Sequence, residues 1–381
     1  MANNFDSNFT RKLAKVFLDK FESERVLSKN VNTQLLSGKF GSDTGDTVDF
    51  KRPTDYTSKR TSAGDISGGT RDSIITGKAS GTVQDYFTVD VDFDEADEAL
   101  KMDQLDSLLA PMATRIKTDL ELDFGEFCLK NTALLSGAVG TGVTTWDHVA
   151  GAGAIMQASG VPMDQDWCYF ANPFTQRSLA SNQRSLGGET GSMSANQRAV
   201  ITDNFAGMKV MTATTLPSYT TGVGADRAGT LSGTPTATYL AAKDTMTMSI
   251  AVTAFQANLV VAAGETITVT GRNRLNLSTR KPIVDETGAQ ILFSGTVTAA
   301  VTLNGSGAGT LVITGPGVYE AAGAFNTVDS ALTSGDVVTL GGAASTLIQP
   351  NLFWHKQAFG IGSVPIKKLY STDTIATTED G

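Results

Sequence analysis

The sequence predicts an α+β protein that carries an inserted antiparallel β-barrel domain. An alternating apolar stretch at 87–93 is followed by a long helical pattern at 111–131. Helix, strand and helix patterns follow one another at 146–186. A block of short alternating runs separated by glycines fills 218–345, and the composition changes at both of its ends. Mixed element order with a separate run of short strands is typical of an α+β domain with a small barrel or sandwich.

The long helix is the element on which the rest is predicted to pack. Apolar residues recur at steps of three and four, which places them on one face of a helix. This predicted buried stripe consists of Leu105, Leu108, Leu109, Met112, Ile116, Leu120, Phe124 and Phe127. The charged residues between them, Glu121 included, are predicted to face water. Pro111 fits the first turn, where its missing N–H costs little, so 94–109 would be a separate or kinked lead-in. The strand at 87–93 is the predicted partner of the stripe.

The N-terminal third differs in composition. Residues 7–27 have the pattern of an amphipathic helix, which could dock on its own body or on a neighbour. Residues 38–81 are rich in Gly, Thr, Ser and charged residues and have too few apolar side chains for a core. Because a structureless loop of this length is unusual in a compact domain, a protruding hairpin that a partner subunit completes is favoured over disorder.

The remaining elements follow local patterns. Helices are predicted at 146–157 and 174–186, and strands at 167–170 and 205–215. In the glycine-punctuated block, 304–309 has the composition of a hairpin tip. Core-like apolar residues return after it at Leu352, Phe353, Trp354, Ala358, Phe359, Ile361, Val364 and Ile366. The β block is therefore predicted to be an insertion, with 346–381 returning to the first domain.

Composition narrows the classes of function. The chain has 381 residues and a net charge of −9, which argues against a nucleic-acid-binding surface spread over all of it but allows a container that touches nucleic acid weakly. Cys128 and Cys168 are predicted to be buried free thiols. Residues 1–10 are polar, so no signal peptide is expected, and no apolar run reaches the ~18 residues of a membrane span.

The sequence predicts no catalytic, cofactor-binding or metal site. The two histidines, His148 and His355, have neither metal-ligand spacing nor a nucleophile motif nearby. The acidic run that starts at Asp90 would need glycine at the sixth position of an EF-hand loop and glutamate at the twelfth, but Glu95 and Lys101 stand there. Its acids are better explained as the wet face of a strand and the first turn of a helix.

Contacts between subunits are predicted at six residues. The candidates are Phe9, Phe17, Arg52, Lys59, Arg60 and Arg71. The two phenylalanines lie on the apolar face of the terminal helix pattern. The four basic residues of the 38–81 segment are either solvated charges or partners of acidic patches on an adjacent subunit.

Several segments together resemble tailed-phage major capsid proteins of the Salmonella-podovirus coat type. LLAPMATRIKTDLELDF is similar to the beginning of their spine helix, and DWCYFANPFTQRSLA to a strand, an Asn-Pro turn and a helix. AGETITVTGRNRLNLSTRKPIVDETGAQILF with GSGAGTLVIT resembles their inserted barrel, and QPNLFWHKQAFGIGSVPI the segment after it. The order of these segments, with an insertion between Pro217 and Ser345, is fairly specific.

The resemblance implies the Hong Kong 97-like capsid fold. An N-terminal arm would span 1–37, the extended E-loop 38–82, the peripheral domain with its spine helix 83–139 and the axial domain 140–217. The inserted barrel would span 218–345, and 346–381 would return to the axial or peripheral domain. Such coats normally continue with further strands, so additional residues or a neighbouring segment would complete the sheet beyond Gly381.

The same resemblance implies a structural protein of the virion, not an enzyme. Such proteins form pentamers and hexamers of an icosahedral shell around double-stranded DNA. Scaffolding protein and a portal are the expected partners, a decoration protein is a possible one, no membrane is involved, and assembly would occur in the host cytoplasm. A tail or decoration component is the alternative, and a hydrolase using His148 or His355 is a more distant one.

Overall fold

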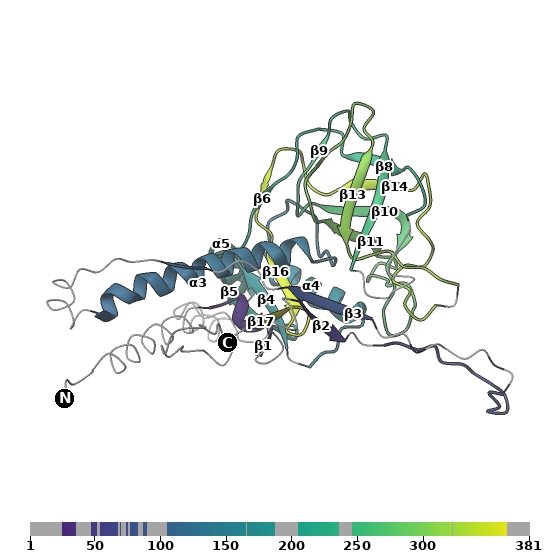
Figure 1. Cartoon of the computed structure of the whole chain (residues 1–381), viewed down its shortest axis with the longest axis horizontal. Helices are drawn as coiled ribbons and strands as arrows, with labels where there is room; N and C mark the ends of the chain where they lie inside the picture. The colour runs from purple at the N-terminus through teal and green to yellow at the C-terminus, as the bar shows by residue number, and fades with distance from the viewer. Residues whose placement is uncertain are drawn as a thin grey trace.

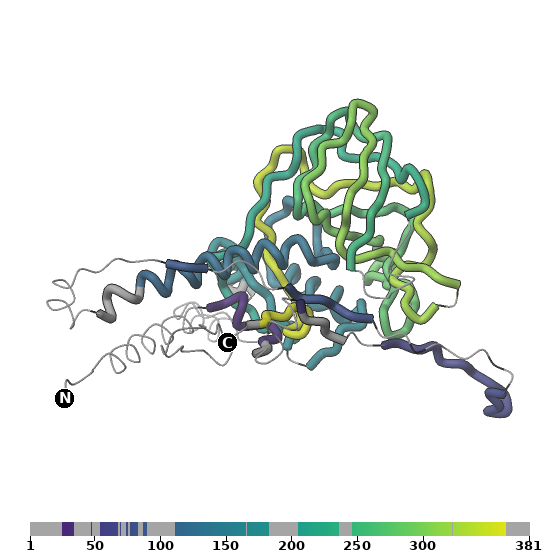
Figure 2. The backbone as a smooth tube through the Cα atoms, in the orientation of Figure 1, coloured from purple at the N-terminus to yellow at the C-terminus, as the bar shows by residue number. Residues whose placement is uncertain are grey.

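In this computed structural model, a body of helices and a small sheet carries a closed β-barrel on one side, and a thin arm leaves the body (Figures 1 and 2). The structure describes residues 25–35, 47–51, 54–67, 69, 74, 77–82, 87–89, 105–164, 166–186, 205–235, 246–321 and 323–363. The mixed helices and sheets, together with the closed barrel, agree with the α+β class.

The longest helix, α3 (Leu105–Lys130), starts before the predicted position, and Pro111 lies inside it. The prediction of a separate helical piece is therefore wrong for 105–109, which belong to α3, and the alternative of a kinked lead-in stays a prediction. A proline inside a helix removes only one backbone hydrogen bond, although it also crowds the preceding turn. The many other bonds of this 26-residue helix outweigh that local cost.

The buried face of α3 is rotated from the predicted stripe. Phe127 is 54% exposed, whereas Glu121, predicted to face water, is 1% exposed. Within 111–130, the part of α3 whose side chains the structure describes, the buried positions are Ala113, Glu121, Phe124, Gly125, Cys128 and Leu129. The spacing of apolar residues identifies the buried face of a helix only approximately. The segment that packs against the helix determines which residues of that face are buried.

This face packs on a sheet formed by residues that follow the helix, whereas the predicted partner was the strand at 87–93. Of that predicted strand, 87–89 lie in no strand and 90–93 lie outside the described residues. An alternating pattern favours an extended chain, but a strand also needs a paired neighbour. The cluster between α3 and the sheet contains Leu27, Val31, Phe124, Cys128, Leu129, Cys168, Phe170, Ala213, Leu216, Leu352 and Trp354.

The sheet has the strand order β16 (Leu352–His355), β4 (Trp167–Ala171), β5 (Met208–Thr212). β4 pairs antiparallel with β16 and parallel with β5. Because side chains alternate along β4, its second face packs against α4 (Trp146–Ala158) and α5 (Pro173–Leu186). These elements match the predictions, with β5 shorter than expected, and Cys128 and Cys168 are buried free thiols as predicted.

The described N-terminal segment lies along the body. Residues 25–27 form no helix, contrary to the prediction for 7–27, whose remainder lies outside the described residues. A short 3-10 turn, η1 (Ser28–Asn30), leads into β1 (Asn32–Leu35). β1 pairs in parallel with β17 (Gly360–Ser363), which brings the two ends of the described chain together.

The arm is a two-stranded hairpin at its base. β2 (Thr47–Lys51) pairs antiparallel with β3 (Lys78–Thr82), in agreement with the predicted protruding hairpin. Residues 54–67 form no regular element beyond it, and this part of the chain extends away from the body (Figure 1).

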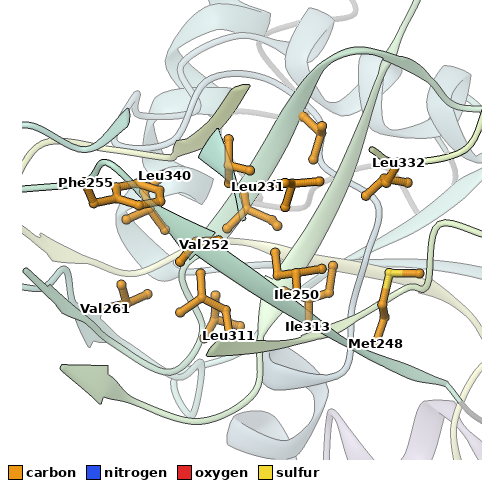
Figure 3. Close-up of a cluster of buried hydrophobic side chains, with 14 of the residues drawn as sticks. Leu231, Met248, Ile250, Val252, Phe255, Val261, Leu311, Ile313, Leu332 and Leu340 are labelled. Carbon is orange, nitrogen blue, oxygen red and sulfur yellow. The ribbon is translucent and has the colours of Figure 1, made fainter. Parts of the chain in front are cut away.

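The inserted block forms a closed six-stranded barrel, as predicted for an antiparallel β domain. Its strands in spatial order are β10 (Thr266–Asn273), β11 (Leu292–Val297), β13 (Gly309–Thr314), β8 (Thr247–Thr253), β7 (Ala228–Leu231) and β14 (Val337–Leu340). Ile250, Leu311 and Ile313 point into the barrel and are completely buried (Figure 3). Ile267 is completely buried as well. β9 (Val260–Val261) pairs with β12 (Val301–Thr302), and β6 (Tyr219–Thr220) with β15 (Leu347–Ile348).

Candidate functional site

The N-terminal segment is fastened to α3 by a single buried carboxylate. Glu121 Oε2 accepts the backbone N–H of Leu27 at 2.7 Å, and Oε1 accepts that of Ser28 at 2.9 Å. The Ser28 hydroxyl also donates to Oε1, and Arg25 Nε donates to that hydroxyl at 2.8 Å. A buried carboxylate is stable only when donors surround it, so Glu121 fixes where the terminal segment leaves the body.

The barrel is fastened to the end of α3 by polar side chains. Arg274 donates to the backbone oxygens of Ala133 at 3.0 Å and Ser294 at 2.7 Å. The hydroxyls of Ser294 and Thr314 donate to the backbone oxygens of Ala133 and Lys130. Burial lowers the pKa of Arg274 to about 10. The carbonyls after a helix end need donors, and here the barrel supplies them.

One barrel loop joins three parts of the molecule. Asn276 Nδ2 donates to the backbone oxygen of Ala158 at the end of α4, at 2.7 Å. Arg280 Nη1 donates to the Asn326 backbone oxygen at 2.7 Å, and its Nη2 forms an ion pair with Asp55 at the base of the arm. Body, barrel and arm are thereby linked through residues 276–280.

A buried ion pair stands where the chain passes into the barrel. Arg227 pairs with Glu265, and both side chains are almost fully buried. Glu265 Oε1 also accepts the backbone N–H of Gly222 at 2.5 Å and of Ala262 at 3.1 Å. Since losing one partner would leave a buried charge unpaired, this pair fixes the geometry of the connection.

Large apolar side chains remain exposed on the arm and at the edges of the body. Ile66 is 69% exposed and Ile74 is 77% exposed, both in the arm segment. Phe174, at the start of α5, is 76% exposed, and Leu347 in β15 is 70% exposed. Exposed apolar groups of this size mark surfaces that associate with other proteins when they form patches.

Two of the six predicted contact residues can be placed. Lys59 and Arg60 are exposed on the arm, beyond the β2–β3 hairpin. Phe9, Phe17, Arg52 and Arg71 lie outside the residues whose side chains the structure describes. The sequence reasoning did not single out Glu121, Arg274 or Arg227 with Glu265. For Glu121 a signal existed, because it shares the three- and four-residue spacing of Phe124, Gly125 and Cys128.

The two histidines have structural partners. His355 Nδ1 accepts the backbone N–H of Gln357 at 3.1 Å, so its Nε2 carries the proton and donates to Asp164 at 2.9 Å. This bond holds the pKa of Asp164 below its usual value. His148 Nδ1 lies 2.8 Å from the Thr145 hydroxyl. Within the described residues, no three His, Cys, Asp or Glu side chains are arranged to hold a metal ion.

Comparison with known proteins shows the family to which the chain belongs. The model of the P22 coat protein family, described as "P22 coat protein - gene protein 5", matches residues 1–381. The chain belongs to the P22 coat protein family. A relative named "Major capsid protein", from Acyrthosiphon pisum secondary endosymbiont phage 1, is 33% identical to this coat protein over 385 residues, which cover 100% of this chain and 90% of the relative.

A solved structure from Mycobacterium phage Che8 is also similar. It covers 85% of this coat protein and 90% of its own chain, with 14% identity and a TM-score of 0.39. Family and relative together identify a phage major capsid protein, a structural component of the virion. Among the described residues, no helix of this coat protein is long and apolar enough to cross a membrane.

Proposed function

We propose that this coat protein forms pentamers and hexamers that close into an icosahedral shell around double-stranded DNA, with a Hong Kong 97-like fold. The observation that carries the proposal is the arm, a hairpin that leaves the body and ends in a segment with exposed Ile66 and Ile74. One chain cannot bury these side chains on its own extended arm. A neighbouring copy can, and obligate interfaces of ~2,000 Å² or more are built in this way.

The proposed parts follow the sequence expectations. Residues 1–37 act as the N-terminal arm and 38–82 as the E-loop, while 83–139 and 140–217 form the peripheral and axial domains. The barrel at 218–345 stiffens the subunit or contacts a neighbour, and 346–381 returns to the body. Scaffolding protein, a portal and a decoration protein are the proposed partners, DNA is touched weakly, and assembly takes place in the host cytoplasm.

The arm gives the first test. Deletion of residues 45–78 should leave a soluble, folded subunit that no longer assembles. Negative-stain microscopy of the protein, expressed with and without the neighbouring scaffold gene, measures assembly. The milder variant I66S/I74S should lower assembly while leaving the melting temperature unchanged. Val284→Ser is the matched control, because Val284 is 53% exposed on the barrel. Normal particles from the deletion would overturn the role of the arm.

The same micrographs address the alternatives. A tail or decoration component would give tubes, trimers or monomers in place of closed shells. A hydrolase would require His148 or His355 in its chemistry, so alanine at both positions with normal assembly, and no hydrolytic activity in the parent protein, removes that reading.

A further inference from the structure

A basic groove lies beside the N-terminal segment. Its volume is about 570 Å³. It is lined by Arg25, Val26, Lys29, Asn30, Lys209, Met211, Thr212 and Lys356. Four of these eight residues are basic and none is acidic, although the whole chain has a net charge of −9. Such a local reversal of charge is an electrostatic footprint for an anionic partner.

The basic residues come from three separate segments that the fold brings together. Arg25 precedes η1 and Lys29 lies within it, Lys209 lies in β5, and Lys356 follows β16. Register pairs Lys209 with Cys168 on β4, and the Lys356 backbone N–H donates to the Asp166 oxygen at 2.9 Å, so both lysines stand at one end of the sheet. The groove therefore depends on the contacts that hold the N-terminal segment against the body, which are the bonds to Glu121, the Trp354 Nε1–H bond to the Asn30 oxygen and the β1–β17 pair.

The cations differ in how firmly they are held. Arg25 is 8% exposed, and its guanidinium donates to the Ser28 hydroxyl and backbone oxygen. Lys29, Lys209 and Lys356 are exposed, and none of them forms an ion pair with an acidic residue in the described part of the chain. Three solvated ammonium groups around a fixed guanidinium suit an extended anion with several charges, since each lysine acts as a mobile point charge.

The N-terminal segment, which lines one side of the groove, and the barrel lie on different sides of α3. In Figure 1 the purple N-terminal segment is below α3, and the barrel is above it. A shell has one face toward the solvent and one toward its contents, so a subunit with its barrel outward would turn the groove inward.

We propose that this groove binds the phosphodiester backbone of the packaged DNA, independently of base sequence. This inference rests on the proposed function, because it takes the shell to contain DNA. Lysines that neutralise phosphates give affinity without sequence preference, and that affinity falls steeply with salt. The acidic remainder of the subunit repels phosphate, so the groove supplies a contact that the rest of the wall does not.

The test measures binding of a roughly 30-base-pair duplex to the unassembled full-length subunit over a salt series starting at about 50 mM. The groove variant K29Q/K209Q/K356Q should bind about tenfold or more weakly, and the slope of log K against log salt should fall by about 2 to 3. The control variant K59Q/K78Q/K281Q removes the same charge at three exposed positions outside the groove and should bind like the parent protein.

Four results would overturn the proposal. They are no binding by the parent subunit, unchanged binding by the groove variant, equal loss in the control variant, and polyglutamate displacing the duplex at equal charge concentration. The last result would assign the groove to an acidic protein partner. Shell assembly of the groove variant, scored by microscopy, should match that of the parent protein. If the parent protein does not assemble, the proposed function is contradicted. The binding measurement on the unassembled subunit still tests whether the groove binds DNA.

Discussion

The carboxylate of Glu121 lies 2.7 Å from the backbone nitrogen of Leu27, a residue 94 positions away in the chain. Glu121 is 1% exposed and Leu27 is fully buried, so the bond forms without competition from water. Ser28 adds a second backbone donor to the same carboxylate at 2.9 Å. The middle of the longest helix thereby holds the N-terminal segment in place.

Glu121→Ala should loosen residues 25–31, while the β1–β17 pair still holds the strand that follows them. The substitution leaves the N–H groups of Leu27 and Ser28 without an acceptor in a buried site, and hydrogen bonds to a charged group are worth about 1.5–3 kcal/mol each. We expect the free energy of unfolding to fall by about 3 kcal/mol, with faster hydrogen exchange at residues 25–31. Chemical denaturation and exchange mass spectrometry measure the two effects.

Glu126→Ala is the matched control for that helix. Glu126 pairs with Lys130 across one turn, and its side chain is 58% exposed. Removing such a surface pair should change stability by about 0.5 kcal/mol or less. Equal effects of the two substitutions would show that Glu121 is not the anchor.

Arg227→Met should destabilise the barrel connection strongly. It leaves Glu265, which is 0% exposed, as an unpaired buried charge, a change that typically costs about 3–5 kcal/mol. Adding Glu265→Gln should restore much of the stability, since the amide oxygen can still accept the Gly222 N–H. Chemical denaturation of both variants tests this, with Arg115→Gln as the control because it removes the exposed Arg115–Asp119 ion pair. A double variant no better than the single one would contradict it.

Gly307→Ala should disturb the hairpin tip between β12 and β13. Gly307 has φ +66°, and a Cβ there would lie 1.8 Å from the Phe255 backbone oxygen. The left-handed conformation alone costs a non-glycine residue about 1–2 kcal/mol, and the backbone clash adds to it. Gly305→Ala is the neighbouring control, because nothing lies within 4 Å of its Cβ position. Thermal melts should show a clear loss for Gly307→Ala and almost none for Gly305→Ala.

Acid should weaken the barrel through Asp336. Burial would raise the pKa of Asp336, but hydrogen bonds from Arg272 and Thr333 outweigh it and hold the pKa below 3.8. A carboxyl group whose pKa is lower in the folded state stabilises the fold at a pH above its pKa in the unfolded state. That stabilisation is lost as the pH falls through the pKa of the folded state. The melting temperature should therefore be steady from about pH 7 to 5 and drop below about pH 4. The Asp336→Asn variant should have a lower melting temperature at neutral pH, and its melting temperature should fall less as the pH is lowered. If the melting temperatures of the variant and the parent protein fall in parallel with pH, Asp336 is not the group responsible.

Elements whose signal is local could be predicted from the sequence. Helix α4, strand β4 and helix α5 lie where residues 146–186 place them, because each has its own apolar period and its own turn residues. The presence of a β domain could also be predicted, since its short strands have alternating apolar residues and glycines mark the turns between them. Its closure into a six-stranded ring depends on β14 meeting both β7 and β10, which no local pattern contains.

Features made by distant segments could not be predicted. The parallel pair β1–β17 joins residues 32–35 to 360–363, and neither stretch has a strong strand pattern. The burial of Glu121 depends on backbone donors 93 to 95 positions earlier. The basic groove combines cations from three separate segments, each of which looks like an ordinary solvated charge in the sequence.

The antiparallel pair β6–β15 sets Thr220 opposite Leu347, so the chain enters and leaves the barrel through a narrow neck. Neighbouring strands lie only ~4.8 Å apart, which makes the two ends of the module nearly coincident. A domain whose own termini lie equally close could replace the barrel, and the barrel contacts to the ends of α3 and α4 and to Asp55 of the arm would then have to be rebuilt. The coat subunit is therefore a scaffold for display engineering, with its natural graft site at the neck.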